Sequence, residues 1–369
     1  MEKNIASYII IDYVDLLKNK EKKREKKQKK TPFYQTILII MVGLIISFFS
    51  QCEITMTYEL LGFYLNWNKS KIIISTFEFL IFFLFSSIYC KFKYTKFNII
   101  YLIISILYTI NSYIYYYRYS RNSFHFPNIA NFWTFIILVI YNLFKYRNNL
   151  LRIPKFFFYG IFIGILANII QLITAYLYIG ANKNDEFQFI FHYSDHINNI
   201  YAIISGTSSS LIYILMENYL YKKKKIIDSL PHISFYSFIL CLIICTLNKE
   251  FSFIGSSLKI FPFKSLCYYI VLIFINIILL IFTPFYIHKC SALSYGIICS
   301  AELCFKILIK FIFEKNEINL VVGFFFALLI FIFGLGFISY ETIKDNSNYE
   351  IDNFIEKEYD VKEKLIKNN

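Results

Sequence analysis

Three charged residues within one apolar stretch are the strongest candidates for chemistry in this chain. Glu302 is followed by Lys306 and Lys310 at intervals of four residues, so all three lie on one face of a helix. Ionisable side chains are costly in an apolar, lipid-embedded helix and commonly mark a substrate or ion pathway. Glu302 and Lys306 are therefore predicted substrate contacts. The structural alternative is a self-neutralising pair, with Lys310 extending to the membrane interface.

Glu78 is a second carboxylate within an apolar run, about 10 Å from its start at 1.5 Å per residue. No basic residue stands four positions further on, so its partner must be water or another helix. A role in proton coupling and a satisfied structural contact both remain open. For Glu217, close to Lys222, interfacial pairing is favoured.

Side-chain amides form a third group of candidates. They can bind a sugar, base or amino acid through paired donors and acceptors, although they also join helices to one another. Those within or near apolar runs are Gln51, Asn111, Asn131, Gln171 and Asn276, and all except Gln171 are predicted substrate contacts.

Catalytic signatures are absent from the sequence. His192, Asp195 and His196 could bind zinc in a helix, but they are a weak constellation, and no HExxH, GxSxG or glycine-rich phosphate loop occurs. The eight cysteines are scattered and form no close pair. We therefore expect no enzyme, no metal and no cofactor.

The composition indicates that the candidate residues lie in membrane helices. Hydrophobic residues make up 57% of the 369 positions and charged residues only 17%, against about a quarter in soluble domains. The net charge of +13 is concentrated at the ends of apolar runs and in the block Lys18–Lys30. The predicted partners are a lipid bilayer and a small solute rather than nucleic acid, and a homodimer remains open.

Ten apolar runs have the length of a membrane span, roughly 20 residues. Proline stands at or just before the start of four of them, where its missing N–H does no harm (Pro32, Pro127, Pro154 and Pro231). The predicted fold is an all-α integral membrane protein with about ten spans, at 33–56, 71–90, 97–117, 127–146, 155–179, 198–221, 233–250, 265–287, 291–313 and 319–340.

Lysine and arginine clusters follow the second, fourth and sixth runs and share one side of the membrane with the N-terminal block. By the positive-inside rule that side is cytosolic. The chain is thus predicted to have a basic cytosolic tail (1–31), a transporter domain (32–340) and a second cytosolic tail (341–369). Plasma membrane and endomembrane both remain open.

The loop from Gly180 to Ile197 divides the domain into halves of five runs, 32–179 and 198–340. Because five is odd, two related halves would enter the membrane in opposite orientations, as the inverted repeats of many transporters do. Gly160 and Gly164, and the small residues from Ser205 to Ser210, should permit close helix packing.

The second half resembles the drug/metabolite transporter superfamily, specifically subfamily F of solute carrier family 35. The stretch 206–223, GTSSSLIYILMENYLYKK, is similar to the family's sixth helix, and 283–294, TPFYIHKCSALS, to the link into its ninth helix. Cys299, Ser300, Ala301 and Glu302 match the small and acidic residues that follow. The third helix departs from the family pattern: Asn111 is kept, but Leu107 and Thr109 occupy its acidic positions.

The resemblance and the polar residues together predict a secondary transporter that moves a small polar or anionic metabolite by alternating access. The alternative is a non-transporting receptor, tether or assembly protein built on a transporter-like scaffold. The scattered polar residues suit an occluded site better than a channel pore.

Overall fold

The computed structural model describes residues 32–64, 72–90, 98–119, 126–148, 155–181, 195–220, 226–253, 263–314 and 322–343. Within these ranges the chain is almost entirely helical and contains no strand. The predicted N-terminal tail 1–31, residues 344–369 of the predicted C-terminal tail 341–369, and most of the Gly180–Ile197 loop lie outside the described residues. Residues 341–343, predicted to belong to that tail, instead form the last turn of the final helix.

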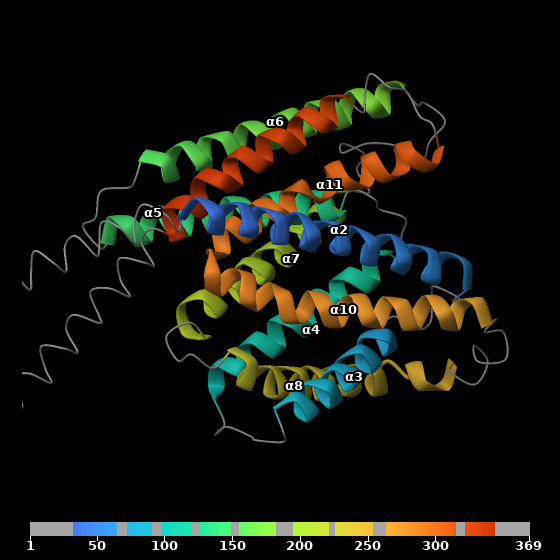
Figure 1. Ribbon diagram of the computed structural model, residues 1–369. Helices are drawn as coiled ribbons and strands as arrows, with labels where there is room; N and C mark the ends of the chain where they lie inside the picture. The colour runs from blue at the N-terminus through green and yellow to red at the C-terminus, as the bar shows by residue number, and fades with distance from the viewer. Residues whose placement is uncertain are drawn as a thin grey trace, which may run out of the picture.

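Each predicted apolar run is a helix (Figure 1). The described part of the chain holds nine long labelled α-helices and the unlabelled final helix, Val322–Ile343. In chain order the labelled elements are α2 (Pro32–Tyr64), α3 (Ile73–Tyr89), α4 (Ile99–Tyr119), α5 (Phe126–Asn148), α6 (Lys155–Ala181), α7 (Asp195–Leu215), the π-helix η1 (Met216–Leu220), α8 (Ile226–Leu247), the 3-10 helix η2 (Glu250–Phe253), α10 (Phe263–Lys289) and α11 (Ala292–Glu314).

Five of the described helices are long and apolar enough to cross a membrane: Lys155–Thr174, Asn199–Tyr219, Ser229–Leu247, Tyr269–Lys289 and Val322–Ile343. Shorter apolar helices cover Tyr34–Ser50, Ile73–Tyr89, Ile99–Ile114 and Ile129–Lys145. The all-helical fold is therefore compatible with a multi-pass membrane protein.

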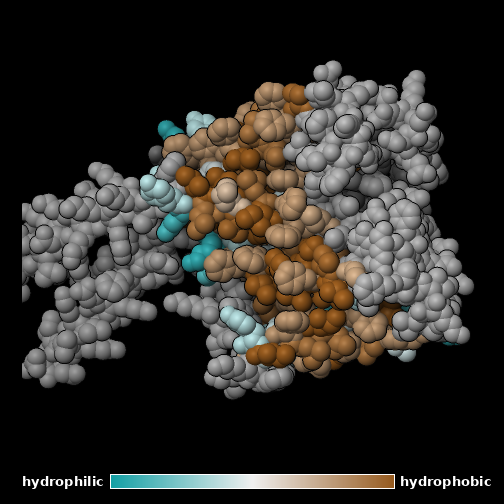
Figure 2. Space-filling view, turned by 45° about the vertical axis from the view of Figure 1, so that its right-hand side comes forward, coloured by the Kyte–Doolittle hydropathy of each residue, from teal (hydrophilic) through white to brown (hydrophobic). Residues whose placement is uncertain are grey.

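The outer surface of the helices has the character expected against lipid. Large apolar side chains point outward, among them Phe162 (62% exposed), Phe274 (64%) and Phe333 (63%). Figure 2 shows apolar side chains covering most of the described face, with hydrophilic ones gathered at one margin. Contiguous exposed apolar surface of this extent is unusual on a water-soluble monomer but normal on a membrane protein.

Helix packing joins the two halves of the chain more than it joins neighbours within a half. The principal contacts pair α3 with α8, α5 with α7, α4 with both α7 and α8, and α11 with both α2 and α5. The α2 helix also packs along α10. The first five and the last five helices therefore interleave in one bundle (Figure 1).

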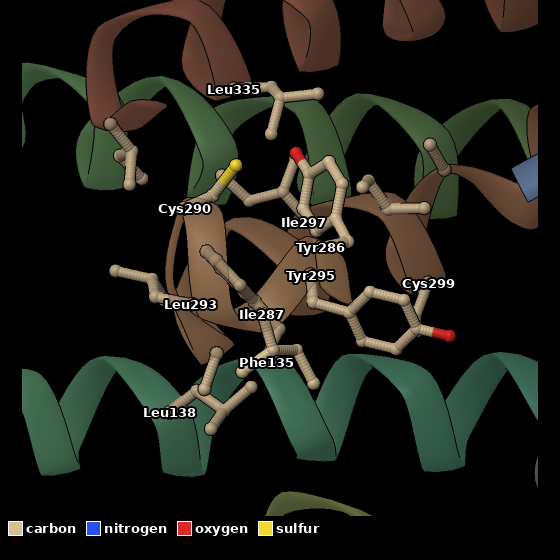
Figure 3. Close-up of a cluster of buried hydrophobic side chains, with 14 of the residues drawn as sticks. Phe135, Leu138, Tyr286, Ile287, Cys290, Leu293, Tyr295, Ile297, Cys299 and Leu335 are labelled. Atoms are coloured by element: carbon tan, nitrogen blue, oxygen red, sulfur yellow. The ribbon is translucent and has the colours of Figure 1, made fainter. Parts of the chain in front are cut away.

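The first half of α11 lies at the centre of this bundle. Every residue from Ser291 to Glu302 is buried. Figure 3 shows Tyr295 and Ile297 of α11 between Phe135 of α5 and Leu335 of the final helix. A side chain from this part of α11 must therefore lie among protein atoms rather than lipid.

Glycines allow the closest helix approaches, as predicted. A Cβ on Gly160 of α6 would lie 2.5 Å from Ile338 Cγ1 and 3.0 Å from the Gly334 carbonyl oxygen. A Cβ on Gly206 of α7 would lie 2.5 Å from the Ala130 carbonyl oxygen of α5. Both predictions of close packing are confirmed.

One predicted boundary is wrong. Pro231 was expected at the start of its helix, whereas α8 begins at Ile226 and contains Pro231 in its second turn. The helix continues beyond the apolar run because its first turn needs no lipid-facing surface, and an early proline disrupts only one intrahelical bond.

Candidate functional site: a buried carboxylate between three helices

The Glu302 carboxylate lies within the protein at the junction of α2, α5 and α11. It belongs to the eleventh residue of the 23-residue α11, and only 7% of the residue is exposed. Because α2 and α5 both pack on α11, the side chain of Glu302, from the second predicted half, meets groups from the first half.

Two neutral groups donate hydrogen bonds to this carboxylate. Ser50 Oγ of α2 donates to Oε1 at 2.6 Å, and Asn131 Nδ2 of α5 donates to Oε2 at 2.9 Å. The same amide nitrogen lies 3.0 Å from the carbonyl oxygen of Cys299, one turn earlier on α11. Two hydrogen bonds thus hold the carboxylate in place. Donor groups on a bound solute could replace Ser50 or Asn131 as the partners of its oxygens.

Two further predicted contacts adjoin this group in the chain. Lys306 lies one turn beyond Glu302 on α11, and Gln51 follows Ser50 on α2. Their side chains are outside the described residues, so the pairing of Glu302 with Lys306 stays a prediction. Gln171 of α6 lies on the same stretch of α11, where Nε2 donates to the Ser300 carbonyl oxygen at 3.1 Å and Oε1 accepts from Cys304 Sγ at 2.9 Å.

Glu78 and Asn276, both half-buried, form a separate pair between α3 and α10. Asn276 Nδ2 donates to Glu78 Oε1 at 3.0 Å. Of the partners left open for Glu78, the structure thus shows one on another helix. The contact has the form of an ordinary interhelical hydrogen bond.

The Glu78–Asn276 bond should contribute modestly to stability. In a double-mutant cycle with Glu78→Leu and Asn276→Leu, we expect a coupling free energy of about 0.6 kcal/mol, with an upper limit of about 2 kcal/mol. Glu78→Gln, which keeps an accepting oxygen, should melt close to the wild type. A coupling well above that range would show that Glu78 is part of a larger polar network, and thermal unfolding in detergent measures it.

Asn111 joins α4 to α7 in a third group. Its Nδ2 donates to Ser209 Oγ at 2.9 Å, while its Oδ1 is buried with no hydrogen-bond partner among the described residues. In a neighbouring contact between α5 and α7, Trp133 Nε1 donates to Thr207 Oγ1 at 3.1 Å.

The candidates therefore form three groups rather than one site: Glu302 with Asn131, Glu78 with Asn276, and Asn111 with Ser209. The hydrogen bonds given above each lie within one group. Ser50 and Ser209 were missed by the sequence analysis, since single serines are common in apolar helices; the proximity of Ser50 to Gln51 was the one available signal.

A small cavity of about 10 Å³, room for roughly one water molecule, lies between α2, α11 and the final helix. Its lining is almost wholly apolar and includes Gly43, Ile298, Ala301 and Phe331 but none of the candidate residues. The small exposed fraction of Glu302, 7%, places its side chain within the protein in this conformation.

The two stretches that carry the family resemblance contact one another. Glu217 Oε2, in η1, accepts from the backbone N–H of Ala292 at 2.8 Å, and Oε1 forms an ion pair with Lys145 of α5 at 2.6 Å. The expected pairing of Glu217 near the bundle end thus occurs with Lys145; Lys222 lies outside the described residues.

Glu250 is a buried acid that the sequence analysis did not select. It is 3% exposed, and its Oε2 accepts from the backbone N–H groups of Ile72 and Ile73 at 2.8 and 3.1 Å. It thereby caps the start of α3. Its position at the end of an apolar run gave no sign of burial.

The weak zinc constellation cannot be placed, because His192 and the side chains of Asp195 and His196 are outside the described residues. Among the residues whose side chains are described, no group of three or more His, Cys, Asp or Glu is placed to hold a metal ion.

Comparison of the chain with protein-family models and with curated proteins gives no match. The class that the structure supports is thus the coarse one, an all-helical protein with several helices able to span a membrane. Its function has to be argued from the buried polar groups.

Proposed function

We propose that this chain is a secondary transporter that moves a small polar or anionic metabolite across a membrane by alternating access. The observation that carries the proposal is the buried Glu302 carboxylate, held between α2, α5 and α11 by neutral donors. Buried ionisable groups within membrane helices face functional cavities or partners far more often than lipid. Glu302 and Asn131 are its central substrate contacts, with Lys306 as the anchor for an anionic group.

The polar contacts support this assignment because they run between the two halves of the chain. Glu302, Glu78 and Asn111 each bond to a partner in the other half of the chain, counted as 32–179 and 198–340. Transporters with two repeats bind substrate at the interface between them. A structural scaffold has no need to place its few membrane-embedded polar groups along that one interface.

Helix pairing supports ten spans in two inverted repeats. When each helix of the first five is exchanged with its counterpart in the last five, the α5–α7 contact becomes the α11–α2 contact. The same exchange turns α4–α7 into α10–α2, and it leaves α3–α8 and α5–α11 unchanged. These pairs are what a two-fold axis in the membrane plane would produce, whereas α4–α8 departs from the pattern because its counterpart, α10–α3, is a minor contact.

The start of α2 and the end of the final helix lie at the same end of the bundle in Figure 1. An even number of spans requires this, and the basic blocks of the sequence make that end cytosolic. Membership of the drug/metabolite transporter superfamily, near subfamily F of solute carrier family 35, is part of the proposal.

One observation favours the alternative of a receptor, tether or assembly protein on a transporter-like scaffold. The carboxylate of Glu302 is enclosed, and both its oxygens already accept hydrogen bonds. A structural carboxylate would look the same in a protein that has only one conformation.

Thermal unfolding of the detergent-purified protein separates the two functions. Nucleotide sugars, nucleotides, vitamins, amino acids and polyamines are each added at high concentration. A site filled at 100 times its Kd stabilises the folded state by about 2.7 kcal/mol, which gives a clear rise in Tm. One chemical class should produce it.

The responding class is then tested for uptake into liposomes that contain the protein. Uptake above that of empty liposomes supports the transporter. A well-folded sample that responds to no class, or that binds a compound without uptake, would favour the scaffold or receptor.

A further inference from the structure

Two carboxylates outside the Glu302 site occupy equivalent places at opposite ends of the bundle. Glu217 follows α7 in the π-helix η1, and Glu250 follows α8 in the 3-10 helix η2. The 22 residues of α8 lie between the two turns, a length of about 33 Å at 1.5 Å per residue.

Each carboxylate caps the first turn of a helix that is distant in sequence. Glu217 accepts from the Ala292 N–H at the start of α11, and Glu250 accepts from Ile72 and Ile73 at the start of α3. Helix N-termini present unpaired N–H groups and a partial positive charge, so a carboxylate there is well stabilised.

Both contacts also hold the predicted halves together. Glu217 pairs with Lys145, and Glu250 reaches α3, so each links the second half to the first. At the Glu217 end, η1 adds two more links: Asn218 Nδ2 donates to Tyr141 Oη of α5, and Asn98 Nδ2 at the start of α4 donates to Tyr219 Oη at 2.7 Å.

The local backbone at both turns is unusual. A π-helical turn is rare and occurs often at functional positions. At the other end Lys249, with φ 54°, has a left-handed conformation, which is unfavourable for a residue with a Cβ. This residue lies in the turn between the end of α8 and Glu250, the first residue of η2. Such strain persists where the surrounding structure compensates for it.

We propose that Glu217 and Glu250 are the two gate latches of the transporter, and that this conformation is the occluded state with both latches closed. The inference rests on the proposed alternating-access function. Breaking the Glu217 latch frees the start of α11, which carries Glu302, while breaking the Glu250 latch frees α3, which carries Glu78. Opening at one end requires the other end to stay closed.

Native cysteines lie directly beneath both latches and report their opening. Cys290 is 2% exposed and lies two residues before Ala292 (Figure 3). Cys245 is fully buried, and its Sγ lies 3.8 Å from Glu250 Oε2 and 3.3 Å from Thr76 Oγ1. Neither thiol can react with a maleimide until its end of the bundle opens.

The test is N-ethylmaleimide labelling of the full-length protein in lipid nanodiscs, quantified for each cysteine by mass spectrometry against SDS-unfolded protein. Glu217→Ala should raise the labelling rate of Cys290 about tenfold or more, since it removes hydrogen bonds to a charged group. It should also lower labelling of Cys245 below the wild-type rate. Glu250→Ala should give the reverse pattern.

The fall at the opposite end distinguishes a gate from a simple helix cap. A rise confined to the mutated end, a rise at both ends, or no change at either would each overturn the proposal. If the alanine variants do not fold, Glu217→Gln and Glu250→Gln keep one accepting oxygen and should give the same reciprocal pattern at smaller amplitude.

Labelling requires no substrate, so its outcome is separate from the transport assay. Reciprocal labelling of a protein that neither binds nor transports any solute would support the latches and contradict the proposed substrate site. A ligand response without reciprocal labelling of Cys290 and Cys245 would support the transporter and contradict the latches.

Discussion

Glu302→Gln is expected to weaken solute binding at least about tenfold and to reduce uptake strongly while leaving the protein folded. Glutamine has nearly the same shape, and its Oε1 can accept from Asn131 Nδ2 as the carboxylate does. The Ser50 hydroxyl, which now donates, can rotate and accept from the new amide nitrogen. Both hydrogen bonds survive, and only the charge is removed.

The loss of charge has opposite effects on binding and on folding. Hydrogen bonds to a charged group contribute about 1.5–3 kcal/mol, so affinity should fall at least about tenfold. At the same solute concentration the ligand-induced stabilisation should then fall by about half or more. The unliganded Tm should change little or rise, because the cost of burying a charge is removed. Thermal unfolding with and without the responding solute measures both effects.

Glu341→Gln is the matched control for this variant. Glu341 is also buried, at 4% exposure, but it lies in the last turn of the final helix rather than at the α2–α5–α11 junction. The Glu341→Gln variant should keep the full ligand-induced rise in Tm. Normal uptake by Glu302→Gln would remove Glu302 from the substrate site.

Gly206→Ala should destabilise the protein by about 1–3 kcal/mol, the usual cost of overpacking a close contact. The added Cβ would lie 2.5 Å from the Ala130 carbonyl oxygen and 3.2 Å from Trp133 Cβ. Because the first of these atoms is backbone, α5 and α7 must separate to admit it. The separation also strains the Trp133–Thr207 hydrogen bond.

The same substitution at Gly336 is the control. A Cβ there would lie 3.5 Å from Ile40 Cδ1, an ordinary contact, and alanine favours helix over glycine by roughly 0.5–1 kcal/mol. Gly336→Ala should therefore be neutral or stabilising in the same thermal unfolding measurement. Equal Tm values for the two variants would show that the close α5–α7 approach is not required.

The effects of these variants depend on helix pairs rather than on single helices. The Glu302 group joins α2, α5 and α11, and the Gly206 contact joins α5 and α7, so α5 takes part in both. A variant that separates α5 from α7 should therefore also weaken the solute response, in proportion to its loss of stability.

The sequence by itself determined the helices and their approximate ends. Each apolar run is a helix, because membrane-length apolar segments must satisfy their backbone groups internally. Proline was a poorer guide to the ends, since Pro231 and Pro284 lie inside α8 and α10. The sequence also identified Glu302, Glu78, Asn111, Asn131 and Asn276 as groups needing partners, since a polar side chain in an apolar run is conspicuous. The close packing at Gly160 and Gly206 was predictable because small residues within an apolar helix allow a neighbouring helix to approach closely.

Only the tertiary structure decided which partners those groups have. Glu302 bonds to Ser50 and Asn131, 252 and 171 residues away, and Glu217 pairs with Lys145, 72 residues away. Helical spacing reveals neighbours within one helix, whereas these contacts depend on which helices cross and at what height. The burial of Glu250 against the start of α3 follows from the same packing, and nothing local in the sequence indicates it.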